Sequence, residues 1–521
     1  MPIAFAIIFV LVLPVKLDKN VENKKKFDYN REYYTTSVLG LIKLFELERE
    51  FMENFTLYAD DLQEKANNLN SFLDALKRPR YTTYMERETF VPNPLNAFGL
   101  IRRLNQDWPK LQNYSKKAVG LVHLDAMKEI LTRAPDDHDM NETLQRMHRI
   151  ETTYDLHAKD IANGLLQSKQ FNYNLTSREC LVIAQHKFGF GDYHRSLRWF
   201  KAALEHNIVG NKVNEENSFK AFVTAVVKRN ISLSNQSLDN EDLQQLVNKK
   251  IQTPKDMEEF ISSKLTLWDM ENTNSTDRTK TPLTAHKIGC RGLYPKRTHG
   301  LVCRYNSTTT PFLRLAPLKM EEISLDPYMV MYHEVISNKE IEDLKGEIKQ
   351  KMDNGWADLA EVVSRIYWIK NESIIRERIN HRITDMTGFD IQEFPALQLA
   401  NFGVGGYFRP HHDYFSERTS ILEPPNPLGD RIGTVIIYAG DVSQGGQTLF
   451  PEIEVAVDPK KGNALFWFNT FDDATQDPRS LHSVCPVIVG SRWTVTKWLH
   501  YAPQLFTKRC YPKVKNISIY P

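Results

Sequence analysis

With 521 residues, the chain is too long for a single hydrophobic core, and its length predicts about three domains. Its composition, with 41% hydrophobic and 25% charged residues, is ordinary for a globular protein. The formal net charge of +2 and the absence of a long basic block exclude, on charge grounds, a protein that binds DNA or RNA.

The first stretch, MPIAFAIIFVLVLPV, is an apolar run that ends at Lys16. A membrane span needs about 20 apolar residues, so this run has the length of a signal peptide instead. We therefore expect residues 1–16 to be a signal peptide, with a short buried helix as the alternative. No later segment is apolar enough to span a bilayer. Sequons that permit N-glycosylation follow at Asn54, Asn113, Asn141, Asn174, Asn230, Asn235, Asn274, Asn306, Asn371 and Asn516.

The cysteines favour an oxidising compartment. Cys290 and Cys303 form one local pair and Cys485 and Cys510 another, at spacings that suit short disulfides, which leaves Cys180 unpaired. There is no C-x-x-C motif and hence no sign of a thiol-exchange or zinc site. A protein of the secretory lumen is expected. The terminal letters SIYP are not a retention signal, so residence in the endoplasmic reticulum would need a partner.

The clearest periodicity lies in Val38–Leu76, where apolar residues recur at spacings of three and four and only Glu48 interrupts the series. Such heptads predict a long helix packed as a coiled coil. A dimerisation helix and an antiparallel helix pair within one subunit fit this pattern almost equally well. Amphipathic helices are also predicted over Leu95–Leu111 and Leu144–Leu166, with Asn93 or Asn96 as a cap. Residues 17–168 are therefore expected to form an all-helical N-terminal domain.

A helix, a tight turn at Gly191-Asp192 and a second helix are predicted over Ser177–His206. The small and aromatic positions of this stretch resemble a tetratricopeptide repeat, a unit that forms grooves for extended peptides. We expect residues 169–282 to be a TPR-like peptide-substrate-binding domain. Tyr193 is a candidate substrate-binding residue, although a role in helix packing is the more common one for such an aromatic side chain.

The pattern changes from Cys290 onward. Residues 283–325 read as a disulfide-bearing linker, and residues 326–521 as a β-rich domain in which Gly, Pro and Asp turns separate short strands. Such strands indicate a sandwich or jelly roll. Strands are predicted at Tyr328–His333, Ala396–Phe402, Thr434–Tyr438, Gly446–Phe450, Ala464–Phe468, Ser483–Val489 and Trp493–His500, and helices at Asn338–Met352 and Ile374–Gly388.

Candidate metal ligands lie within this β-rich region. His411 and Asp413 are two residues apart, so both would point to one face of a strand. His482, from a distant strand, would complete a set of two histidines and one carboxylate with open positions, as expected for a non-haem Fe(II) oxygenase. Alone, H-x-D is more often a solvated turn than a ligand pair. His412 should face the other way.

The last predicted strand supplies a cation for a chelating oxo-acid co-substrate. Arg492 and His500 fall on one face of this strand, together with Thr494, Thr496 and Trp498. Arg492 would hold a carboxylate in a bidentate fork. Lys497 falls on the opposite face, which argues against Lys497 as the anchor.

These motifs resemble the catalytic alpha subunit of collagen-type prolyl 4-hydroxylase nearly end to end. The resemblance is carried by VPNPLNAFGLIRRLN, the repeat around GDY, CRY, NFGVGG, PHHDY, GGQTLFPEI, KKGNALFWFN, HSVCPVIVG and KWLH. It implies a double-stranded β-helix (jelly roll) catalytic domain that uses Fe(II), 2-oxoglutarate, O2 and L-ascorbate to convert peptidyl proline to 4-hydroxyproline. It also implies an α2β2 tetramer with protein disulfide isomerase in the endoplasmic reticulum lumen and procollagen or another proline-rich peptide as substrate.

By position, the resemblance implies that His411, Asp413 and His482 are iron ligands and that His500 assists 2-oxoglutarate binding and decarboxylation. The chain also departs from the family. Arg492 stands where Lys is usual, and Phe402 and Phe408 stand where Tyr is frequent. After the repeat turn, Tyr193-His194 replaces a tyrosine pair. These departures leave two alternatives to a prolyl hydroxylase: a divergent hydroxylase of another residue or a non-collagen protein, and a weakly active peptide-binding scaffold.

Overall fold

The computed structural model describes residues 34–75, 83–205, 283–295, 300–349, 364–370, 373–391, 396–415 and 428–505. The expected signal peptide (1–16), the part of the TPR-like domain beyond residue 205, and Cys510 lie outside these residues. The chain divides into two compact units, Leu39–Met140 and a second unit that runs from Asn141 and also includes the residues up to Val38. Across the described residues, no helix is long and apolar enough to cross a membrane.

The unit Leu39–Met140 is entirely helical within the described residues. Its helices are α1 (Val38–Ala75), α2 (Tyr84–Phe90), α3 (Pro94–Arg102), α4 (Trp108–Lys116) and α5 (Leu121–Thr132), and a π-helical turn joins α3 to α4. Asn93 caps α3 by accepting a hydrogen bond from the backbone N–H of Leu95, and Pro94 starts the helix because it needs no amide partner there. The predicted long helix and the predicted helix after it are therefore both confirmed.

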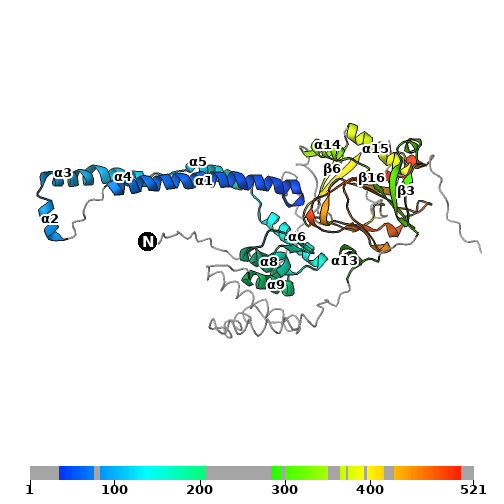
Figure 1. Cartoon of the computed structure of the whole chain (residues 1–521), viewed down its shortest axis with the longest axis horizontal. Coiled ribbons are helices and arrows are strands. Elements are labelled where there is room, and N and C mark those ends of the chain that lie inside the picture. The colour runs from blue at the N-terminus through cyan, green and yellow to red at the C-terminus, as the bar shows by residue number, and fades with distance from the viewer. Residues whose placement is uncertain are drawn as a thin grey trace, which may run out of the picture. The chain divides into compact units, whose positions relative to one another are not determined.

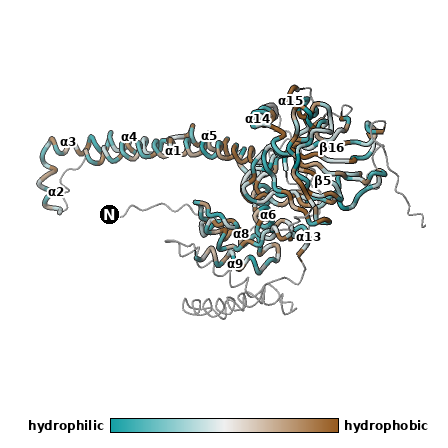
Figure 2. Tube along the Cα trace, turned by 45° about the vertical axis from the view of Figure 1, so that its right-hand side comes forward, coloured by the Kyte–Doolittle hydropathy of each residue, from teal (hydrophilic) through white to brown (hydrophobic). Residues whose placement is uncertain are grey.

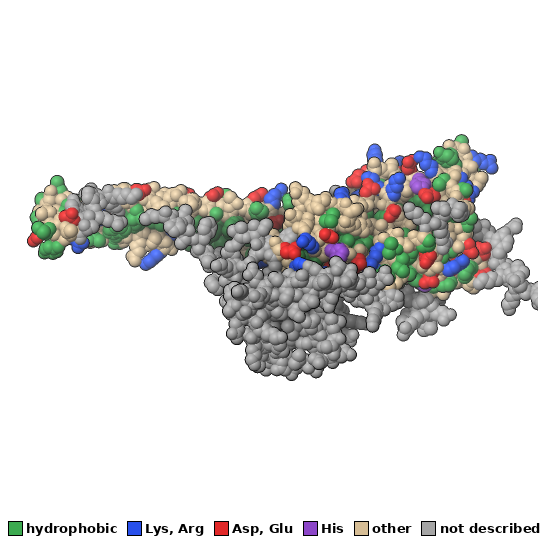
Figure 3. Space-filling model, turned by 60° about the horizontal axis from the view of Figure 1, so that its bottom comes forward, with side chains coloured by type: hydrophobic (Ala, Val, Ile, Leu, Met, Phe, Trp, Pro, Cys, Tyr) green, Lys and Arg blue, Asp and Glu red, His purple; other side chains and the backbone are tan. Residues whose placement is uncertain are grey.

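The partners of α1 run backward along the chain. Glu50 pairs with Arg133 at 3.2 Å and Asp61 with His123 at 3.9 Å, while Lys65 donates to the backbone carbonyl of Ser115 at 2.7 Å. Helices α4 and α5 consequently lie antiparallel to α1, as the helix-pair alternative predicts. Hydrophobic and hydrophilic residues mix along these helices (Figure 2), and hydrophobic side chains reach the surface of this unit (Figure 3).

The second unit starts with helices. These are α6 (Asp137–Tyr154, of which Asn141 onward belongs here), α7 (Ala158–Ala162), α8 (Ser177–Gly189) and α9 (Tyr193–Glu205), with a small hairpin β1 (Leu165–Leu166) and β2 (Lys169–Gln170). Gly191 turns the chain between α8 and α9 with a φ of +78°, where a side chain would be strained. Cys180, Ala184 and Phe200 pack between the two helices. The predicted helix–turn–helix is therefore confirmed.

The rest of the unit is built mainly from antiparallel strands. They are β3 (Cys303–Asn306), β4 (Leu318–Leu325), β5 (Tyr328–His333), β6 (Arg365–Ile369), β7 (Leu397–Phe402), β8 (Phe408–His411), β9 (Arg431–Tyr438), β10 (Val442–Gly445), β11 (Thr448–Phe450), β12 (Val455–Val457), β13 (Ala464–Phe468), β14 (His482–Val484), β15 (Val487–Gly490) and β16 (Arg492–His500). Three further helices are α13 (Ala285–Cys290), α14 (Asn338–Lys349) and α15 (Ile374–Thr387).

Two sheets face each other as a jelly roll. The eight-stranded sheet has the order β3-β4-β5-β13-β9-β16-β7-β6, and the four-stranded sheet has the order β12-β11-β14-β8. Met331, Tyr438 and Trp467 of the large sheet pack with Phe450 and Val457 of the small sheet. Helices α14 and α15 lie against the outer face of the large sheet (Figure 1).

The sequence located most strands but not all. The region expected as a linker contributes β3 and β4. In LKMEEISL the buried positions are Met320, Glu322 and Ser324, so two of the three are polar and the strand shows no apolar alternation. The stretch predicted as one strand at Ser483–Val489 is two strands that belong to different sheets, interrupted at Pro486. Strands β6, β8, β10 and β12 were also not predicted. Strand β8 is an edge strand, which accommodates Pro410.

Candidate metal centre

Strands β8 and β14 bring the candidate ligands together. His411 ends β8, Asp413 follows two residues later, and His482 opens β14. The two strands are neighbours in the small sheet, with His411 opposite His482 in the register. One ligand atom from each of His411, Asp413 and His482 lies within 4.8 Å of the others.

The two imidazoles converge on one carboxylate. His411 Nε2 lies 3.7 Å from Asp413 Oδ1, and His482 Nε2 lies 3.6 Å from Asp413 Oδ2. Asp413 and His482 are buried, whereas His411 is partly accessible, with 20% of its side chain exposed. The gap between these atoms is too long for direct hydrogen bonds but suits a shared metal ion, which keeps its ligands about 2.0–2.2 Å from itself.

Backbone carbonyls orient both rings. The Nδ1 of His411 lies 2.8 Å from the carbonyl oxygen of Arg409, and the Nδ1 of His482 lies 3.0 Å from that of Ser480. A carbonyl only accepts, so each Nδ1 carries the proton and each Nε2 presents a lone pair to the centre. Burial, and then the neighbouring His482, lower the pKa of His411 to about 3. His411 is therefore a neutral nitrogen donor at physiological pH.

A residue of the large sheet hydrogen-bonds the Asp413 carboxylate. Thr434 donates its hydroxyl to Asp413 Oδ2 at 2.7 Å, and Asn469 donates its side-chain amide to Thr434 Oγ1 at 2.9 Å. Burial alone raises the pKa of the Asp413 carboxyl, but His482, His411 and the Thr434 hydrogen bond outweigh it, and the net direction is down. No sequence motif singles out Thr434 or Asn469 as part of the site. The signal for Thr434 is its polar side chain within the apolar strand IGTVIIY.

This donor set fits Fe(II). Two neutral imidazole nitrogens and one carboxylate oxygen on one side of the ion match the facial set of non-haem iron oxygenases, which leaves positions for a chelating co-substrate and O2. There is no thiolate or further carboxylate among the clustered ligands, within the part of the chain that the structure describes. His412 is not a ligand: its Nε2 lies 3.1 Å from the Pro478 carbonyl and its ring stacks on Tyr414.

Arg492 is a buried cation between the two sheets. It opens β16 in the large sheet with 1% of its surface exposed, and its Nη2 donates to Thr448 Oγ1 of β11 in the small sheet at 2.9 Å. Its guanidinium also lies over the rings of Phe402 and Tyr438, at 5.0 and 5.5 Å. Among the described residues its Nε has no hydrogen-bond partner. A guanidinium cannot lose its charge in a protein, so this site calls for an anion.

His500 lies at the other end of β16. Its Nδ1 is 3.1 Å from the carbonyl of Gly429, and burial lowers its pKa. Its partner in the register, Arg431, donates to the backbone carbonyl of Asp413 at 3.4 Å and stacks over Trp498 at 4.1 Å. His500 and Arg492 therefore lie at opposite ends of the same strand. Arg431 and Trp498 lie near the metal ligands, at the end of the strand that carries His500.

The disulfide pairing differs from the expected one. Cys290, at the end of α13, is bonded to Cys485, with Cα atoms 5.6 Å apart. Both are buried in one apolar cluster, whereas Cys303 is free and exposed on the edge strand β3. The predicted local pairs, Cys290 with Cys303 and Cys485 with Cys510, are both wrong in this structure, because Cys290 and Cys485 are bonded to each other. Cys510 lies outside the described residues, and Cys180 is free and buried.

Tyr193 is remote from the metal centre in the fold. It begins α9, in the helical pair that packs around Cys180 and Ala184 rather than in either sheet. Phe408, one of the departures from the family, stacks on the His411 ring with centroids 3.6 Å apart. The other departure, Phe402, lies beside Arg492.

Two family models match this chain, one in its N-terminal part and one over the strands that carry the metal centre. A family model described as the prolyl 4-hydroxylase alpha-subunit N-terminal region matches residues 37–168, and one described as the 2OG-Fe(II) oxygenase superfamily matches residues 397–500. The second match contains His411, Asp413, His482, Arg492 and His500.

Relatives match almost the whole chain. Human prolyl 4-hydroxylase subunit alpha-1 is 28% identical over 96% of this chain and 98% of that protein. The rat subunit alpha-1 is 29% identical over 92% of this chain and 95% of its own length, and subunit alpha-2 of Caenorhabditis elegans is 27% identical over 81% and 83%. Among solved structures, a viral collagen prolyl hydroxylase aligns to 33% of this chain and 95% of its own, at 19% identity and a TM-score of 0.28, too low to support an argument.

Proposed function

Because this chain belongs to the prolyl 4-hydroxylase alpha-subunit family and is an Fe(II)- and 2-oxoglutarate-dependent dioxygenase, we propose that it hydroxylates peptidyl proline at C4 in collagen-like sequence. The observation that carries the proposal is the convergence of His411, Asp413 and His482 between two sheets. When bound there, Fe(II) supplies O2 activation coupled to decarboxylation of 2-oxoglutarate to succinate. The two Nε2 lone pairs and the carboxylate would hold the ion.

Arg492 is proposed to anchor the distal carboxylate of 2-oxoglutarate. Its charge is buried, its Nε has no partner among the described residues, and Thr448 and Tyr438 fix its position. A planar guanidinium matches a carboxylate with two parallel hydrogen bonds. Lys497, on the other face of β16, donates to the backbone carbonyl of Ala396 instead. We propose L-ascorbate as the reductant that maintains Fe(II), on the resemblance alone.

The peptidyl proline is proposed to lie on the His500 side of the metal. Trp498 is tilted against Trp368 with ring centroids 5.7 Å apart, and Arg431 covers the other side of Trp498. Aromatic faces of this kind suit the apolar ring of proline. Arg431 also contacts the backbone of Asp413, so this aromatic group adjoins the metal. The role of His500 in 2-oxoglutarate binding and decarboxylation, implied by the resemblance, is retained as part of the proposal.

We further propose that residues 169–282 form the TPR-like domain that binds proline-rich peptide, with Tyr193 as a contact. The pair α8–α9 has the helix–turn–helix form of such a repeat. Residues 17–168, 283–325 and 326–521 keep their proposed roles as dimerisation domain, disulfide-bearing linker and catalytic domain, although β3 and β4 of the linker pair with the catalytic sheet.

Assembly and location are proposed on two grounds. The apolar positions of α1 leave Phe45, Met52 and Phe55 more than half exposed, at 72%, 62% and 56%, which suits a second copy of the chain. The alpha-subunit relatives imply a beta subunit, for which we propose protein disulfide isomerase in an α2β2 tetramer. The signal peptide of residues 1–16 and the sequons then fit a glycoprotein of the endoplasmic reticulum lumen.

The test is co-expression with protein disulfide isomerase, followed by assay with (Pro-Pro-Gly)n peptide, Fe(II) and 2-oxoglutarate. We expect peptide-dependent succinate release together with 4-hydroxyproline in the peptide. Succinate release with hydroxylation of a residue other than proline would contradict the proposed substrate. Absence of succinate above background would contradict the proposed activity and favour a binding role.

His482→Ala provides the matching site test. Loss of one buried ligand nitrogen should abolish turnover and lower Fe(II) retention, while tetramer assembly remains intact. His412→Ala is the control, since His412 lies beside the ligands but faces the Pro478 carbonyl. Loss of assembly in His482→Ala would instead make His482 a structural residue.

A further inference from the structure

Helix α6 lies between the α8–α9 pair and the jelly roll, and its two faces differ. Leu144 and Met147 pack against the core of the α8–α9 pair. Ile150 and Tyr154, further along the helix, pack with Leu449 of the small sheet. One helix therefore contacts the proposed peptide-binding pair and the metal-bearing domain at once.

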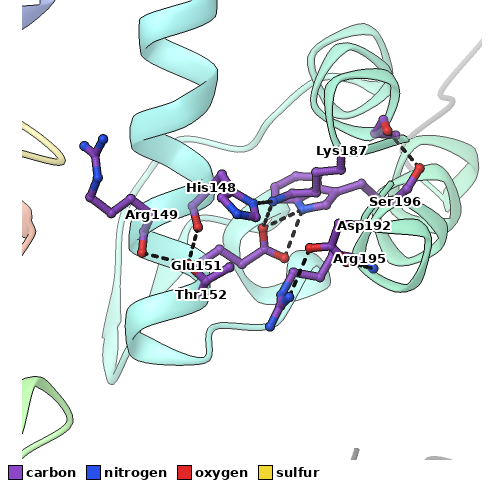
Figure 4. A network of polar contacts seen from close by, with 10 residues as sticks. His148, Arg149, Glu151, Thr152, Lys187, Asp192, Arg195 and Ser196 are labelled. Carbon is purple, nitrogen blue, oxygen red and sulfur yellow. Dashed lines mark hydrogen bonds and ion pairs between the residues drawn. The ribbon is translucent and has the colours of Figure 1, made fainter. Parts of the chain in front are cut away.

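The first face holds α8 and α9 through buried charges (Figure 4). Glu151 and Lys187 form an ion pair in which each is almost fully buried, and Trp199 donates its Nε1–H to Glu151 at 3.1 Å. Lys187 Nζ lies 3.1 Å from His148 Nδ1, and burial followed by Lys187 lowers the pKa of His148 to about 4, so the imidazole is neutral and accepts. Because breaking a buried pair strands a charge, this contact is rigid.

The opposite face of α6 makes hydrogen bonds to the turn between β7 and β8. Arg146 donates to the carbonyl of Val404 at 3.1 Å, and Arg149 donates to the carbonyl of Gly405 at 2.8 Å. The Arg149 guanidinium also lies 4.1 Å from the ring centre of Tyr407. Two cations from one helix thus bind two consecutive carbonyls of the turn that leads into His411.

The turn is shaped for this contact. Gly405 has a φ of +68°, and a Cβ at this position would lie 2.6 Å from the Cβ of Arg146. Its amide donates to the carbonyl of Val487 at 2.7 Å, and Val487 in turn donates to the carbonyl of Gly406 at 3.0 Å. The turn is therefore held between α6 and β15, and only glycine allows the helix to come so close.

We propose that α6 fixes the distance between the α8–α9 pair and the iron-binding strand β8, with Arg149 as the positioning residue. This inference rests on the proposed function, since it concerns a proline-rich peptide long enough to contact both α8–α9 and the metal centre. We call the contacts of Arg146 and Arg149 with the carbonyls of Val404 and Gly405 the clamp. The clamp keeps α8–α9 at a fixed distance from the metal centre, so that a peptide segment bound on α8–α9 presents a neighbouring proline to the metal. A short peptide, which reaches the metal centre alone, gains nothing from the clamp.

The consequence is a difference between peptides of two lengths. Arg149→Met removes the donor and the charge but keeps the bulk of the side chain. We expect it to raise the KM for a long (Pro-Pro-Gly)n peptide about tenfold, the value of one hydrogen bond to a charged group. The KM for a short peptide, the KM for 2-oxoglutarate and the peptide-free turnover of 2-oxoglutarate should stay within about twofold.

The test uses the full chain in its assembled complex and adds hydrogen–deuterium exchange. Arg149→Met should increase exchange in residues 403–411, while α8 and α9 keep their protection. Arg149→Lys, which keeps a charge over Tyr407 but loses the planar fork, serves as a milder variant if Arg149→Met does not fold. The matched control is Arg304→Met. Arg304 lies on β3, at the edge of the large sheet; its side chain is 56% exposed and pairs with Glu322 of β4.

Two results would overturn the clamp: unchanged exchange in residues 403–411 in both Arg149 variants, or an equal rise in KM for short and long peptides. The exchange measurement needs no turnover. If the wild type fails to hydroxylate any peptide, the proposed function fails, while the exchange data still decide whether Arg149 holds the turn.

Discussion

Two basic side chains are buried on opposite faces of β16, and they have different surroundings. Arg492 and Lys497 are each 1% exposed. Arg492 points between the sheets, toward Thr448 of the small sheet, with its Nε unpartnered among the described residues. Lys497 points outward, toward the layer that contains α15, and donates to the carbonyl of Ala396 at 3.3 Å. Burial, followed by the nearby Arg376, lowers the pKa of Lys497 to about 7.

Burial does not by itself mark a basic side chain as functional. A buried lysine escapes the cost of its charge by releasing its proton, and a carbonyl then satisfies the remaining N–H. A guanidinium has no such escape. Its burial is costly unless an anion compensates the charge, and none of the described residues supplies one to Arg492. The anion is therefore expected from the co-substrate.

The largest predicted change in KM distinguishes Arg492 from Lys497. Arg492→Met should raise the KM for 2-oxoglutarate by about 100-fold or more, because a bidentate charged contact is lost. Lys497→Met, a matched substitution on the other face of the same strand, should leave this KM within about twofold. Steady-state succinate release at varied 2-oxoglutarate measures both. An equal rise in this KM for both variants would contradict a functional difference between the two faces of β16.

The second expected effect concerns stability. The folded-state pKa of Lys497, about 7, lies below its unfolded value, so the unfolded chain binds a proton that the folded chain lacks between about pH 7 and pH 10.5. The stability of the wild type should rise with pH across this window. Lys497→Met removes the cost and should stabilise the protein by about 4 kcal/mol at pH 7, with the gain shrinking toward pH 10. Denaturant unfolding at several pH values measures the gap; a gap independent of pH would contradict a buried, neutral Lys497.

A smaller effect tests the shape of the anchor. Arg492→Lys keeps the positive charge but replaces the planar fork by a point charge on a shorter side chain. We expect the KM for 2-oxoglutarate to rise about tenfold, with kcat changed far less. If Arg492→Lys is as impaired as Arg492→Met, the charge alone does not account for binding. If it matches the wild type, the fork geometry does not matter.

The sequence was enough to predict that His411, Asp413 and His482 cluster, because part of the pattern is local. His411 and Asp413 stand two residues apart, and strand alternation places both on one face. The same alternation places Arg492 and Lys497 on opposite faces of the strand. Residues that act through a partner leave no such pattern. Thr434 and Thr448 become recognisable only when the register places them beside Asp413 and Arg492.

Pairings between distant segments were the least predictable feature. Sequence proximity favours Cys290 with Cys303, but the fold pairs Cys290 with Cys485, 195 residues away. The clamp of Arg149 on Gly405 joins residues 256 positions apart, and neither residue shows a motif. Contacts of this kind follow from the packing of whole elements, which a local pattern does not encode.

The smallest expected effect tests what steadies Arg492. Thr448→Val keeps the shape of the side chain but removes the hydroxyl that accepts from Arg492 Nη2 and lies 2.8 Å from the Tyr438 hydroxyl. We expect the KM for 2-oxoglutarate to rise about threefold, since one neutral hydroxyl is worth about 1 kcal/mol. Thr310→Val is the matched control, because the Thr310 hydroxyl bonds Asp385 of α15 instead. A rise in KM as large as that of Arg492→Met would contradict this supporting role. It would mean that Thr448 itself binds the co-substrate, so that the binding site on the inner side of β16 includes a second residue.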